Sequence, residues 1–399
     1  MAKEQFDIVV SGGGLAGLTA AAAFGHAGYS VLLLDPAPPA KPNEVDTSDL
    51  RSTAYLQPAR YLLKEIGLWS SVADFAVPLE TLRIVDCIGE PPKLREERAF
   101  QAAELGDAAL GWNLLNWLTV QKFRSYLAKQ PNVEMRLGQG FSGLLARTSA
   151  AIVTLTDGSQ VSTKLVIGAD GRDSTVRKSV GIGVKTTRYG QKSLAFTASH
   201  TRPHNNVSTE IYHLGGPFTV VPLADVKGQS ASAIVWMNDG RRSLELAQMP
   251  VKEFNVEMNR RSAGLFGPME LISQRAVWPI VTQLADKLAT ERTALVAEAA
   301  HVLPPIGAQG LNTSLNDISA LLHAAKAFPD ALGERQMLDS YAHARLPDIK
   351  KRAKAIDLFN RVTRSGATGP QTLRLFGLKA AHDIAPIRQA LMRAGMGPT

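Results

Sequence analysis

Three glycines near the start of the chain have the spacing of a phosphate-binding turn. Gly12, Gly14 and Gly17 form a G-x-G-x-x-G pattern directly after the apolar run of residues 6–10. In such a pattern the first glycine permits a tight turn, the second lets the backbone approach a pyrophosphate, and the third lets a helix pack closely on the strand. The helix that follows directs unpaired N–H groups and the positive end of its dipole at the phosphates. The pattern therefore predicts a dinucleotide-binding turn.

The elements that must position these glycines form a β-α-β unit. Residues 6–10 and 31–34 are apolar and predict two buried parallel strands, and residues 18–24 predict the helix between them. Asp35 closes the second strand, where a carboxylate can accept hydrogen bonds from ribose hydroxyl groups. By itself this unit is compatible with either NAD or FAD.

Two later segments bear on that choice. Residues 165–169 predict a buried strand that ends at Asp170-Gly171, although Asp-Gly is also a favourable pair in an ordinary turn. Much further along, an apolar segment leads to the acid Glu298, then to a Pro304-Pro305 loop and a helix start at Gln309-Gly310. Combined with the glycine pattern, this last segment favours FAD.

The composition is that of an ordinary globular protein. The chain has 399 residues, 45% of them apolar and 20% charged, which suits two closely joined domains. No apolar run reaches about 18 residues and no basic-then-apolar leader precedes the first strand, so we expect a cytoplasmic protein that does not span a membrane. Cys87 is the single cysteine, and no Cys/His cluster has the spacing of a zinc or iron–sulfur site, so we predict neither a disulfide nor a metal site. Redox chemistry would then require a bound organic cofactor.

The net charge of +8 is concentrated near the C-terminus. From residue 350 onward, Asp357 and Asp383 oppose ten basic residues: Lys350, Lys351, Arg352, Lys354, Arg361, Arg364, Arg374, Lys379, Arg388 and Arg393. Such a segment suits an anionic partner, whether membrane lipid, nucleic acid or an acidic protein, or is simply a solvated helical face. Ile384, Ile387 and Leu391 recur at helical spacing, which predicts an amphipathic helix that lies on a bilayer or docks on the protein's own core.

Together, the three motifs resemble those of the group A flavoprotein aromatic hydroxylases, which have the p-hydroxybenzoate hydroxylase fold. Within that superfamily the chain is most similar to the ubiquinone-biosynthesis hydroxylases. Glu298-Ala299-Ala300-His301 belongs to the third of the superfamily motifs. The residues that support the similarity to the ubiquinone-biosynthesis hydroxylases are Asp49-Leu50-Arg51-Ser52-Thr53-Ala54, Gly111-Trp112-Asn113 with Asn116, and the run from Pro305 to Asn312. The resemblance covers about residues 5 to 350. It implies FAD as the cofactor, with NAD(P)H and O2 as co-substrates.

The resemblance also implies roles for matching residues at the cofactor. Glu298 would hydrogen-bond the ribityl or ribose part of FAD, and Arg51 would offset the charge of its pyrophosphate. Asn116 and Gln121 would approach the ribityl chain from one helix, although Gln121 stands where the family commonly has arginine. Asp170 would tie the second motif to the flavin site and to the approach of NAD(P)H.

The third motif would lie against the flavin ring. Pro304 and Pro305 would line the substrate side of the ring. The helix that starts at Gly310-Leu311-Asn312 would direct N–H groups at the flavin pyrimidine and stabilise negative charge there. His301 would pack beside the same loop, and no residue is assigned as a catalytic acid or base.

Two departures from the family pattern concern cofactor binding. Ala297 occupies a position that is usually glycine, and Thr313-Ser314 replaces a Leu-Gly pair. A Cβ at either place would narrow the approach of the backbone to the cofactor. One alternative is therefore a flavin-poor, non-enzymatic assembly subunit of a quinone-biosynthesis complex.

The predicted fold class is α/β, with a Rossmann-like FAD domain, an inserted antiparallel-sheet substrate domain and a C-terminal helical segment. The predicted boundaries are 1–75, 105–180 and 285–345 for the FAD domain, 76–104 and 181–284 for the substrate domain, and 346–399 for the helical segment. Alternating residues in the second domain predict strands within 194–199, 209–214, 218–221 and 231–236. Candidates for a substrate pocket, or for the core of this sheet, are Tyr212, Phe218, Trp236 and Trp278.

The implied function is that of an FAD-dependent, NAD(P)H-consuming monooxygenase that hydroxylates a prenylated phenol ring in ubiquinone biosynthesis through a C4a-hydroperoxyflavin. The expected partners are this hydrophobic substrate and, through the basic C-terminal segment, the inner face of the membrane and other quinone-biosynthesis proteins. A soluble catabolic aromatic hydroxylase with a small polar substrate is the alternative enzyme. Nucleic acid is not expected, because the basic residues lack interleaved aromatic residues.

Overall fold

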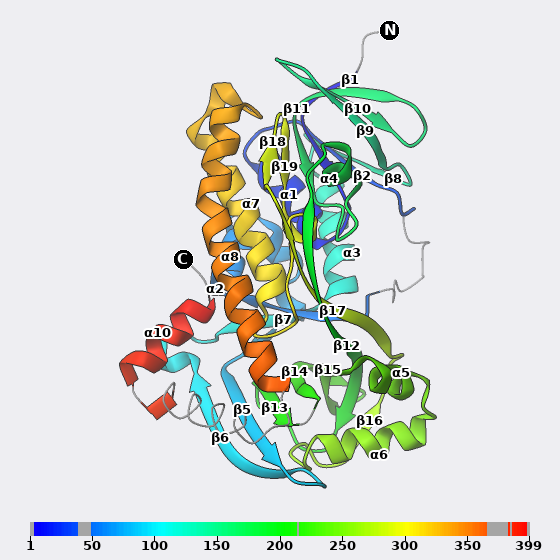
Figure 1. Ribbon diagram of the computed structural model, residues 1–399, viewed down its shortest axis with the longest axis vertical. Helices are drawn as coiled ribbons and strands as arrows, with labels where there is room; N and C mark the ends of the chain where they lie inside the picture. Colours follow the sequence, from blue (N-terminus) through cyan, green and yellow to red (C-terminus); the bar gives the residue numbers. More distant parts are fainter. Residues whose placement is uncertain (1–3, 39–48, 214, 365–381, 384, 397–399) are drawn as a thin grey trace.

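The molecule is elongated, with one large β-sheet toward each end and long helices along one side (Figure 1). The computed structural model describes residues 4–38, 49–213, 215–364, 382–383 and 385–396. Among the described residues, no helix combines the length and apolar composition needed to cross a bilayer.

The first sheet is largely parallel. Its strands are β1 (Glu4–Ser11), β2 (Val31–Asp35), β8 (Val133–Leu137), β9 (Phe141–Ala146), β10 (Ala151–Leu155), β11 (Gln160–Gly168), β18 (Ala289–Thr290) and β19 (Thr293–Leu295). The order across the sheet is β18-β19-β11-β1-β2-β8, with β10 beside β11 and β9 beside β10. Strands β8, β2, β1, β11 and β19 run parallel to their neighbours in that order.

The predicted β-α-β unit at the start of the chain is confirmed. Helix α1 (Leu15–His26) connects β1 to β2. The apolar residues at the centres of both strands are fully buried, as expected for parallel strands that are covered on both faces. The predicted Asp-Gly turn follows β11, and the short helix α4 (Thr175–Ser179) begins after Ser174, whose side chain accepts a hydrogen bond from the backbone N–H of Arg177.

The second sheet is antiparallel apart from one parallel pair, β13 with β5. Its strands are β5 (Thr81–Ile88), β6 (Lys93–Gln101), β12 (Val184–His200), β13 (Val207–His213), β14 (Gly216–Val226), β15 (Gln229–Asp239), β16 (Met269–Leu271), β17 (Ala276–Ala285) and β20 (His301–Val302). The order is β20-β17-β12-β15-β14-β13-β5-β6, with β16 beside β12. The predicted strands lie within β12 to β15, except that residue 214 is outside the described residues.

One face of the second sheet carries its own hydrophobic core. Helices α5 (Gly240–Gln248) and α6 (Val251–Arg261) cover this face (Figure 1). Phe218 and Trp236 lie in this core, where their rings meet edge to face at 5.4 Å between centroids. These two candidates for a substrate pocket are therefore core residues.

A small third sheet and several helices complete the described chain. The sheet consists of β3 (Ser52–Leu56), β7 (Gly111–Leu115) and β4 (Val77–Leu79). The other helices are α2 (Gln57–Glu65), α3 (Asn116–Leu127), α7 (Gln309–Ala327) and α8 (Arg335–Arg364), and the short 3₁₀ helices are η1 (Leu68–Ser71), η2 (Ala73–Phe75), η3 (Ala102–Leu105), η4 (Ala297–Ala299) and η5 (Pro329–Ala331).

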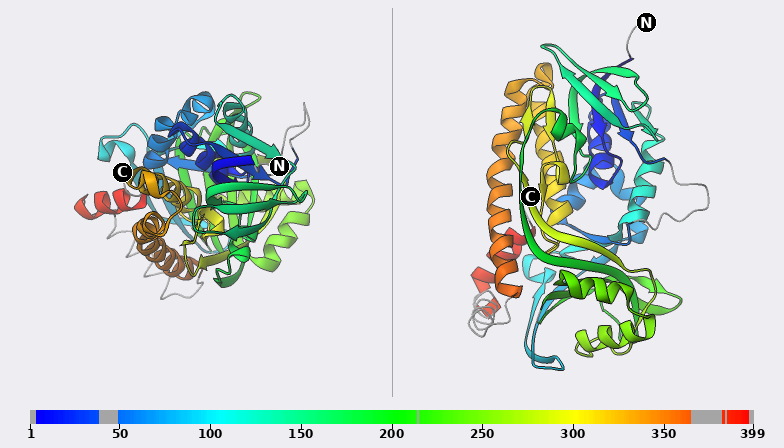
Figure 2. Two further views of the ribbon diagram at one scale, coloured as in Figure 1. Left: turned by 90° about the horizontal axis from the view of Figure 1, so that it is seen from above. Right: turned by 45° about the vertical axis from the view of Figure 1, so that its right-hand side comes forward.

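Helix α8 is continuous across the predicted boundary at residues 345 and 346. It has 30 residues with Pro347 inside it, and it runs along one side of the molecule past both large sheets (Figure 2). Near its start, the Tyr341 hydroxyl donates a hydrogen bond of 2.8 Å to the Leu295 carbonyl at the end of β19. Near its end, Asn360 donates to Gln191 of β12. The contacts at both ends stabilise the helix despite the backbone hydrogen bond that proline cannot make.

The predicted amphipathic helix near the C-terminus is present as α10 (Ala385–Met396). Among the described side chains of this helix, Met392 is buried, whereas Leu391 is 49% exposed. Arg388 donates a hydrogen bond of 2.6 Å to the Glu104 carboxylate, so its charge is neutralised within the chain instead of being free for an anionic partner. Predictions that lie outside the described residues concern Arg374, Lys379, Ile384 and the side chains of Arg364 and Ile387.

Candidate functional site

The three sequence motifs meet at one edge of the first sheet. Ser11 at the end of β1 lies opposite Gly168 at the end of β11, and Gly168 lies opposite Leu295 at the end of β19. On the other side of β1, Ser11 lies opposite Leu34 near the end of β2. Four neighbouring parallel strands thus have their carboxyl ends together, which is where open α/β sheets bind ligands.

Two glycines of the first motif have no room for a side chain, and the third has space beside it. Gly12 has φ +114°, and a Cβ there would lie 2.4 Å from the Ala169 carbonyl oxygen. A Cβ on Gly17 would lie 1.8 Å from the Gly12 carbonyl oxygen. On Gly14, by contrast, a Cβ would have no atom of the described residues within 4 Å apart from its chain neighbours. The backbone at Gly14 therefore faces a space that a ligand can enter.

Asp35 also holds this turn in place. Its carboxylate accepts hydrogen bonds from the backbone N–H groups of Gly13 and Ala37. A Cβ on Gly13 would lie 2.8 Å from Asp35 Oδ2, so Gly13 is a further position that requires glycine, and the G-x-G-x-x-G pattern does not reveal it. A carboxylate has about four acceptor sites, which leaves Asp35 able to accept from a ligand hydroxyl as well.

Glu298 lies in η4, three residues beyond the end of β19. Its side chain is partly exposed, and among the described residues no group donates a hydrogen bond to its carboxylate. The positive charge of Arg51 is close enough to interact with it. An unpaired carboxylate beside the open glycine turn fits the ribose or ribityl hydroxyls of a dinucleotide cofactor.

Arg51 belongs to a polar cluster with Asp49, Thr53 and Asn116. Its guanidinium donates to both Asp49 oxygens at 2.7 and 2.8 Å and lies 5.0 Å from the centre of the Trp278 ring. Asn116 donates to Asp49 at 2.9 Å and accepts from the Thr53 hydroxyl at 2.7 Å. Burial would raise the pKa of Asp49, but its bonds to Arg51 and Asn116 and the charge of Arg51 outweigh burial and lower it.

Arg51 is still accessible to a ligand. Burial alone would lower its pKa, yet the bond to Asp49 and the charges of Asp49 and Glu298 raise it. The Arg51 side chain is 43% exposed, so one side of the guanidinium can meet an anion. The cluster therefore positions a permanent positive charge near the carboxyl ends of the strands.

Asp170 caps the helix after the second motif. Its Oδ1 accepts a hydrogen bond from the Ser174 hydroxyl, and its Oδ2 accepts one of 3.0 Å from the Val176 N–H. The carboxylate thus fixes the turn that packs against Gly12. A Cβ on Gly12 would lie 3.0 Å from the Asp170 Cα.

The third motif places its loop and helix on the same side of the molecule. Pro304 is buried and Pro305 is exposed. Asn312 donates from Nδ2 to the Ala54 carbonyl at 2.8 Å and accepts from the Leu56 N–H at 2.9 Å, so its side chain joins α7 to β3. Gly310 is exposed and Leu311 half-buried, which leaves the first N–H groups of α7 accessible to a ligand.

His301 is buried and belongs to a hydrogen-bonded network. Its Nε2 is 2.6 Å from Asp317 Oδ2, and the other Asp317 oxygen accepts a hydrogen bond of 2.9 Å from Arg345. Asp317 also accepts from the Ala297 N–H at 3.1 Å. The network connects α7 and α8 to the turn that carries Glu298. His301 is therefore better explained as part of this support than as a catalytic base.

Helix α3 contributes a cation that the sequence motifs do not reveal. Gln121 is exposed, whereas Arg124 on the next turn directs its guanidinium at the glycine-rich turn. Nη2 of Arg124 lies 3.4 Å from the Gly13 carbonyl oxygen. Within the described part of the chain, its buried Nε has no hydrogen-bond partner. The only sequence signal would have been its helical spacing from Asn116 and Gln121.

The two departures from the family pattern have different structural consequences. Thr313 and Ser314 are both buried in α7, and the Ser314 hydroxyl donates to the Gly310 carbonyl of its own helix. Ala297 has φ +57°, a left-handed conformation that costs an L-residue roughly 1 kcal/mol. Glycine adopts this φ without strain, which explains why glycine is the usual residue at this position.

We expect the substitution Ala297→Gly to change the free energy of unfolding by less than about 0.5 kcal/mol, because relief of the positive-φ strain offsets the loss of a buried methyl group. Urea denaturation at equal excess of cofactor measures the change. Ala299→Gly is the matched control in the same turn, where φ is not positive. It should destabilise by about 1 kcal/mol through loss of a buried methyl group. Equal losses in both variants would contradict the strain at Ala297.

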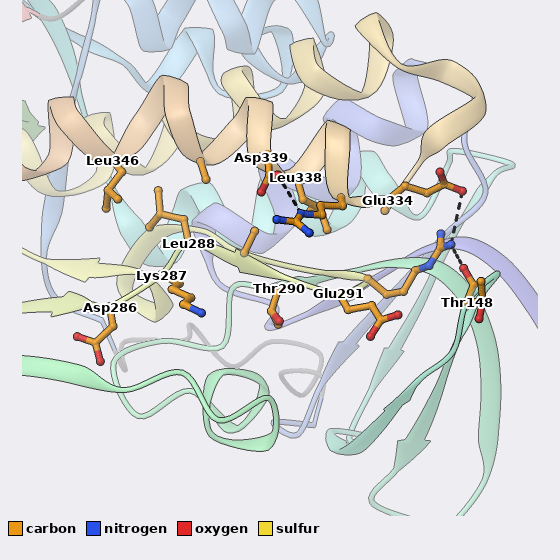
Figure 3. Close-up of a pocket in the computed structure, with 15 residues that line it drawn as sticks. Thr148, Asp286, Lys287, Leu288, Thr290, Glu291, Glu334, Leu338, Asp339 and Leu346 are labelled. Carbon is orange, nitrogen blue, oxygen red and sulfur yellow. Dashed lines mark hydrogen bonds and ion pairs between the residues drawn. The ribbon is translucent and has the colours of Figure 1, made fainter.

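A separate groove lies beside β18, between the loop before this strand and the start of α8 (Figure 3). Its volume is about 720 Å³, and none of the motif residues contributes to its wall. Charged side chains at its rim pair with each other, as Arg335 does with Asp339 and Arg292 with Glu334. The groove is therefore distinct from the site at the carboxyl ends of the strands.

The site has the features that a dinucleotide cofactor requires. The open backbone at Gly14 and the first N–H groups of α1 suit a pyrophosphate, and the free carboxylate of Glu298 suits sugar hydroxyls. Arg51 and Arg124 supply positive charge around that space.

Comparisons with known proteins agree with this arrangement. The profile of the FAD-binding domain family matches residues 5–355. The chain is 30% identical to "Ubiquinone hydroxylase UbiL" of Rhodospirillum rubrum, over 99% of this chain and 90% of that protein. It is 24% identical to "3-demethoxyubiquinol 3-hydroxylase" of Escherichia coli over the full length of both. Among solved structures, p-nitrophenol 4-monooxygenase PnpA from Pseudomonas putida superposes with a TM-score of 0.79 at 19% identity, covering 98% of this chain and 97% of that one.

Proposed function

Because this chain belongs to the FAD-binding domain family, among the FAD-dependent aromatic hydroxylases that include ubiquinone-biosynthesis enzymes, we propose that it hydroxylates a prenylated phenol in ubiquinone biosynthesis. We propose NAD(P)H as the reductant and O2 as the oxidant. The observation that carries the proposal is the meeting of three motifs around Gly14 and Glu298, in a chain that aligns with a ubiquinone hydroxylase over almost its whole length.

When bound, FAD supplies the redox chemistry by taking electrons from NAD(P)H and using them to activate O2. We propose that the first N–H groups of α1 bind its pyrophosphate, with Arg51 and Arg124 offsetting the charge. Asp35 and Glu298 accept hydrogen bonds from its sugar hydroxyls. The first N–H groups of α7 stabilise negative charge at the flavin ring.

We infer that the aromatic ring of the substrate lies against the face of the second sheet opposite its core. This face, here called the inner face, carries the half-buried residues Thr219, Val221, Val235 and Trp278 on neighbouring strands. Its mainly apolar side chains suit a prenylated ring. The names of the two aligned relatives refer to a ubiquinone and a demethoxyubiquinol, which are compounds of this class.

We also propose that the outer side of α8 contacts an anionic membrane surface. Lys351, Lys354, Leu358 and Arg361 follow one another at helical spacing on this side, and all four are exposed. Within the described residues the two lysines form no ion pair, whereas Arg361 pairs with Asp357. Flotation of the purified protein with anionic but not with neutral vesicles would support this contact. Equal flotation with both would count against it.

The purified protein should carry FAD, oxidise NAD(P)H faster in the presence of a prenylated phenol, and convert that phenol to a hydroxylated product detectable by mass spectrometry. A strain without the gene should accumulate the unhydroxylated precursor in lipid extracts. Turnover of simple polar phenols without any effect on quinone precursors would instead indicate a catabolic hydroxylase. A colourless protein that co-purifies with other quinone enzymes would indicate an assembly subunit.

A further inference from the structure

Glu210 is a carboxylic acid on the apolar inner face of the second sheet. It lies near the middle of β13, and its side chain is buried, with 8% of the residue exposed. Burying a carboxylate is costly unless hydrogen bonds satisfy it. An acid in the middle of this face therefore requires an explanation that packing does not give.

The strand register shows which face Glu210 occupies. Glu210 lies opposite Thr219 on β14, and Thr219 lies opposite Val235 on β15. Residues opposite each other in a sheet point to the same side. Glu210 thus shares a face with the half-buried Thr219 and Val235. Its neighbour Ile211 points to the opposite side, into the core around Phe218.

The inner face lies against the loop of the third motif. Met237, two residues beyond Val235 on β15, packs with Leu303 and Ile306 of that loop. The backbone N–H of Gly307 in the same loop donates a hydrogen bond to the Glu210 carboxylate. Glu210 therefore lies where the second sheet meets the loop that is proposed to line the flavin ring.

Both groups that bond Glu210 are donors. The Tyr212 hydroxyl donates to Oε2 from the same face of β13, and the second donor is the Gly307 N–H. Among the described residues, no charged side chain pairs with the Glu210 carboxylate, and the ring of Phe359 on α8 packs against Tyr212 at 5.9 Å between centroids. Burial raises the pKa of Glu210, although the bonds from Tyr212 and Gly307 act to lower it. The carboxyl is thus a stronger base than an exposed glutamate.

We propose that Glu210 is the general base that accepts the phenolic proton of the aromatic substrate. This proposal rests on the proposed function. The O–H bond of the phenol breaks, the electron pair stays on the phenolic oxygen, and the proton moves to the Glu210 carboxylate. The ring gains electron density as the proton leaves, which favours its attack on an electrophilic oxygen. A positioned base of this kind typically contributes 10²–10⁴-fold to the rate.

The test compares the FAD-loaded wild-type protein with Glu210→Gln, using 2-prenylphenol and a ring-fluorinated 2-prenylphenol whose hydroxyl is more acidic. Glu210→Gln should lower kcat for 2-prenylphenol by about 100-fold or more with a smaller change in KM. The loss should be much smaller for the fluorinated phenol, which ionises without a base. The acid limb of the wild-type pH profile should disappear in the variant. Tyr212→Phe, which keeps the carboxylate, should retain that limb.

A second readout does not depend on turnover. The ¹³C signal of the hydroxyl-bearing carbon of bound, labelled 2-prenylphenol reports the ionisation of the phenol. It should move toward the phenolate position at lower pH in the wild-type protein than in Glu210→Gln. If Glu210→Gln does not fold, Glu210→Asp is the second variant, because it keeps two acceptor oxygens for the neighbouring donors, and it should show reduced kcat with the acid limb preserved.

Two kinds of result would overturn the proposal. An active wild type together with Glu210→Gln that keeps its kcat, its acid limb and its ¹³C titration would refute the role of Glu210 alone. An equal loss with both phenols would show that Glu210 is structural, and would also refute it. Wild-type protein that binds FAD but hydroxylates neither phenol would instead refute the proposed function, and the role of Glu210 with it.

Discussion

Replacement of Gly12 by alanine is expected to abolish FAD binding and to destabilise the first sheet. Alanine at φ +114° is strained, and its Cβ would lie 2.4 Å from a backbone oxygen that cannot move without displacing the turn after β11. The same turn is held by Asp170. We expect at least about a 100-fold loss of FAD affinity, or about 2.7 kcal/mol. Titration of the purified protein with FAD, followed by flavin fluorescence, measures it.

The substitution Gly14→Ala is expected to lower FAD affinity without lowering the stability of the fold. Apart from its chain neighbours, no atom of the described residues lies within 4 Å of a Cβ at this position, so thermal unfolding without FAD should match that of the wild type. FAD affinity should nevertheless fall, because the methyl group would occupy the space proposed for the pyrophosphate. Gly143→Ala is the control, since its Cβ also meets nothing within 4 Å but lies on β9, away from the site. If Gly14→Ala bound FAD as tightly as Gly143→Ala, the pyrophosphate would have to lie elsewhere.

Replacement of Asp317 by alanine is expected to destabilise the protein by about 3–5 kcal/mol, because it removes one of the two carboxylates that pair with the buried guanidinium of Arg345. Burial by itself would lower the pKa of Arg345, but the charge and hydrogen bonds of Asp317 and Asp348 raise it, so the guanidinium stays charged in the fold. The His301 and Ala297 contacts would be lost as well. Urea denaturation at a fixed excess of FAD measures the change.

Asp339→Ala is the matched control for this prediction. Asp339 forms an exposed ion pair with Arg335 on α8, and such pairs contribute between zero and about 1 kcal/mol. The change should therefore stay within about 0.5 kcal/mol. FAD affinity should fall in Asp317→Ala and stay unchanged in Asp339→Ala, since only Asp317 supports the turn that carries Glu298. Similar losses of stability in the two variants would mean that the buried network is not a principal support of the fold.

Local patterns were sufficient to predict the elements around the cofactor site. The two apolar strands at the start of the chain and the helix between them each depend on a few neighbouring residues, and these predictions are confirmed. The fold class is likewise confirmed. The domain boundaries and the cofactor contacts of individual residues stay predictions.

Features that depend on distant partners were not predictable from such patterns. Asp317 resembles any helical acid until its partners His301 and Arg345, 16 and 28 residues away, come together around it. In the sequence alone, Glu210 is likewise one polar residue of an alternating strand. Its significance depends on a loop nearly a hundred residues later. The basic C-terminal residues were treated as one charged surface, yet Arg388 pairs with Glu104 on another element.

The continuity of α8 has a mechanical consequence. Thirty helical residues extend about 45 Å, so a single stiff element is fixed to β19 by Tyr341 at one end and to β12 by Asn360 at the other. A hinge motion that moved the two sheets apart would have to bend this helix or break one of its end contacts. Ligand entry and exit should therefore use movements of loops or of the cofactor, and the two halves should unfold together in one cooperative transition.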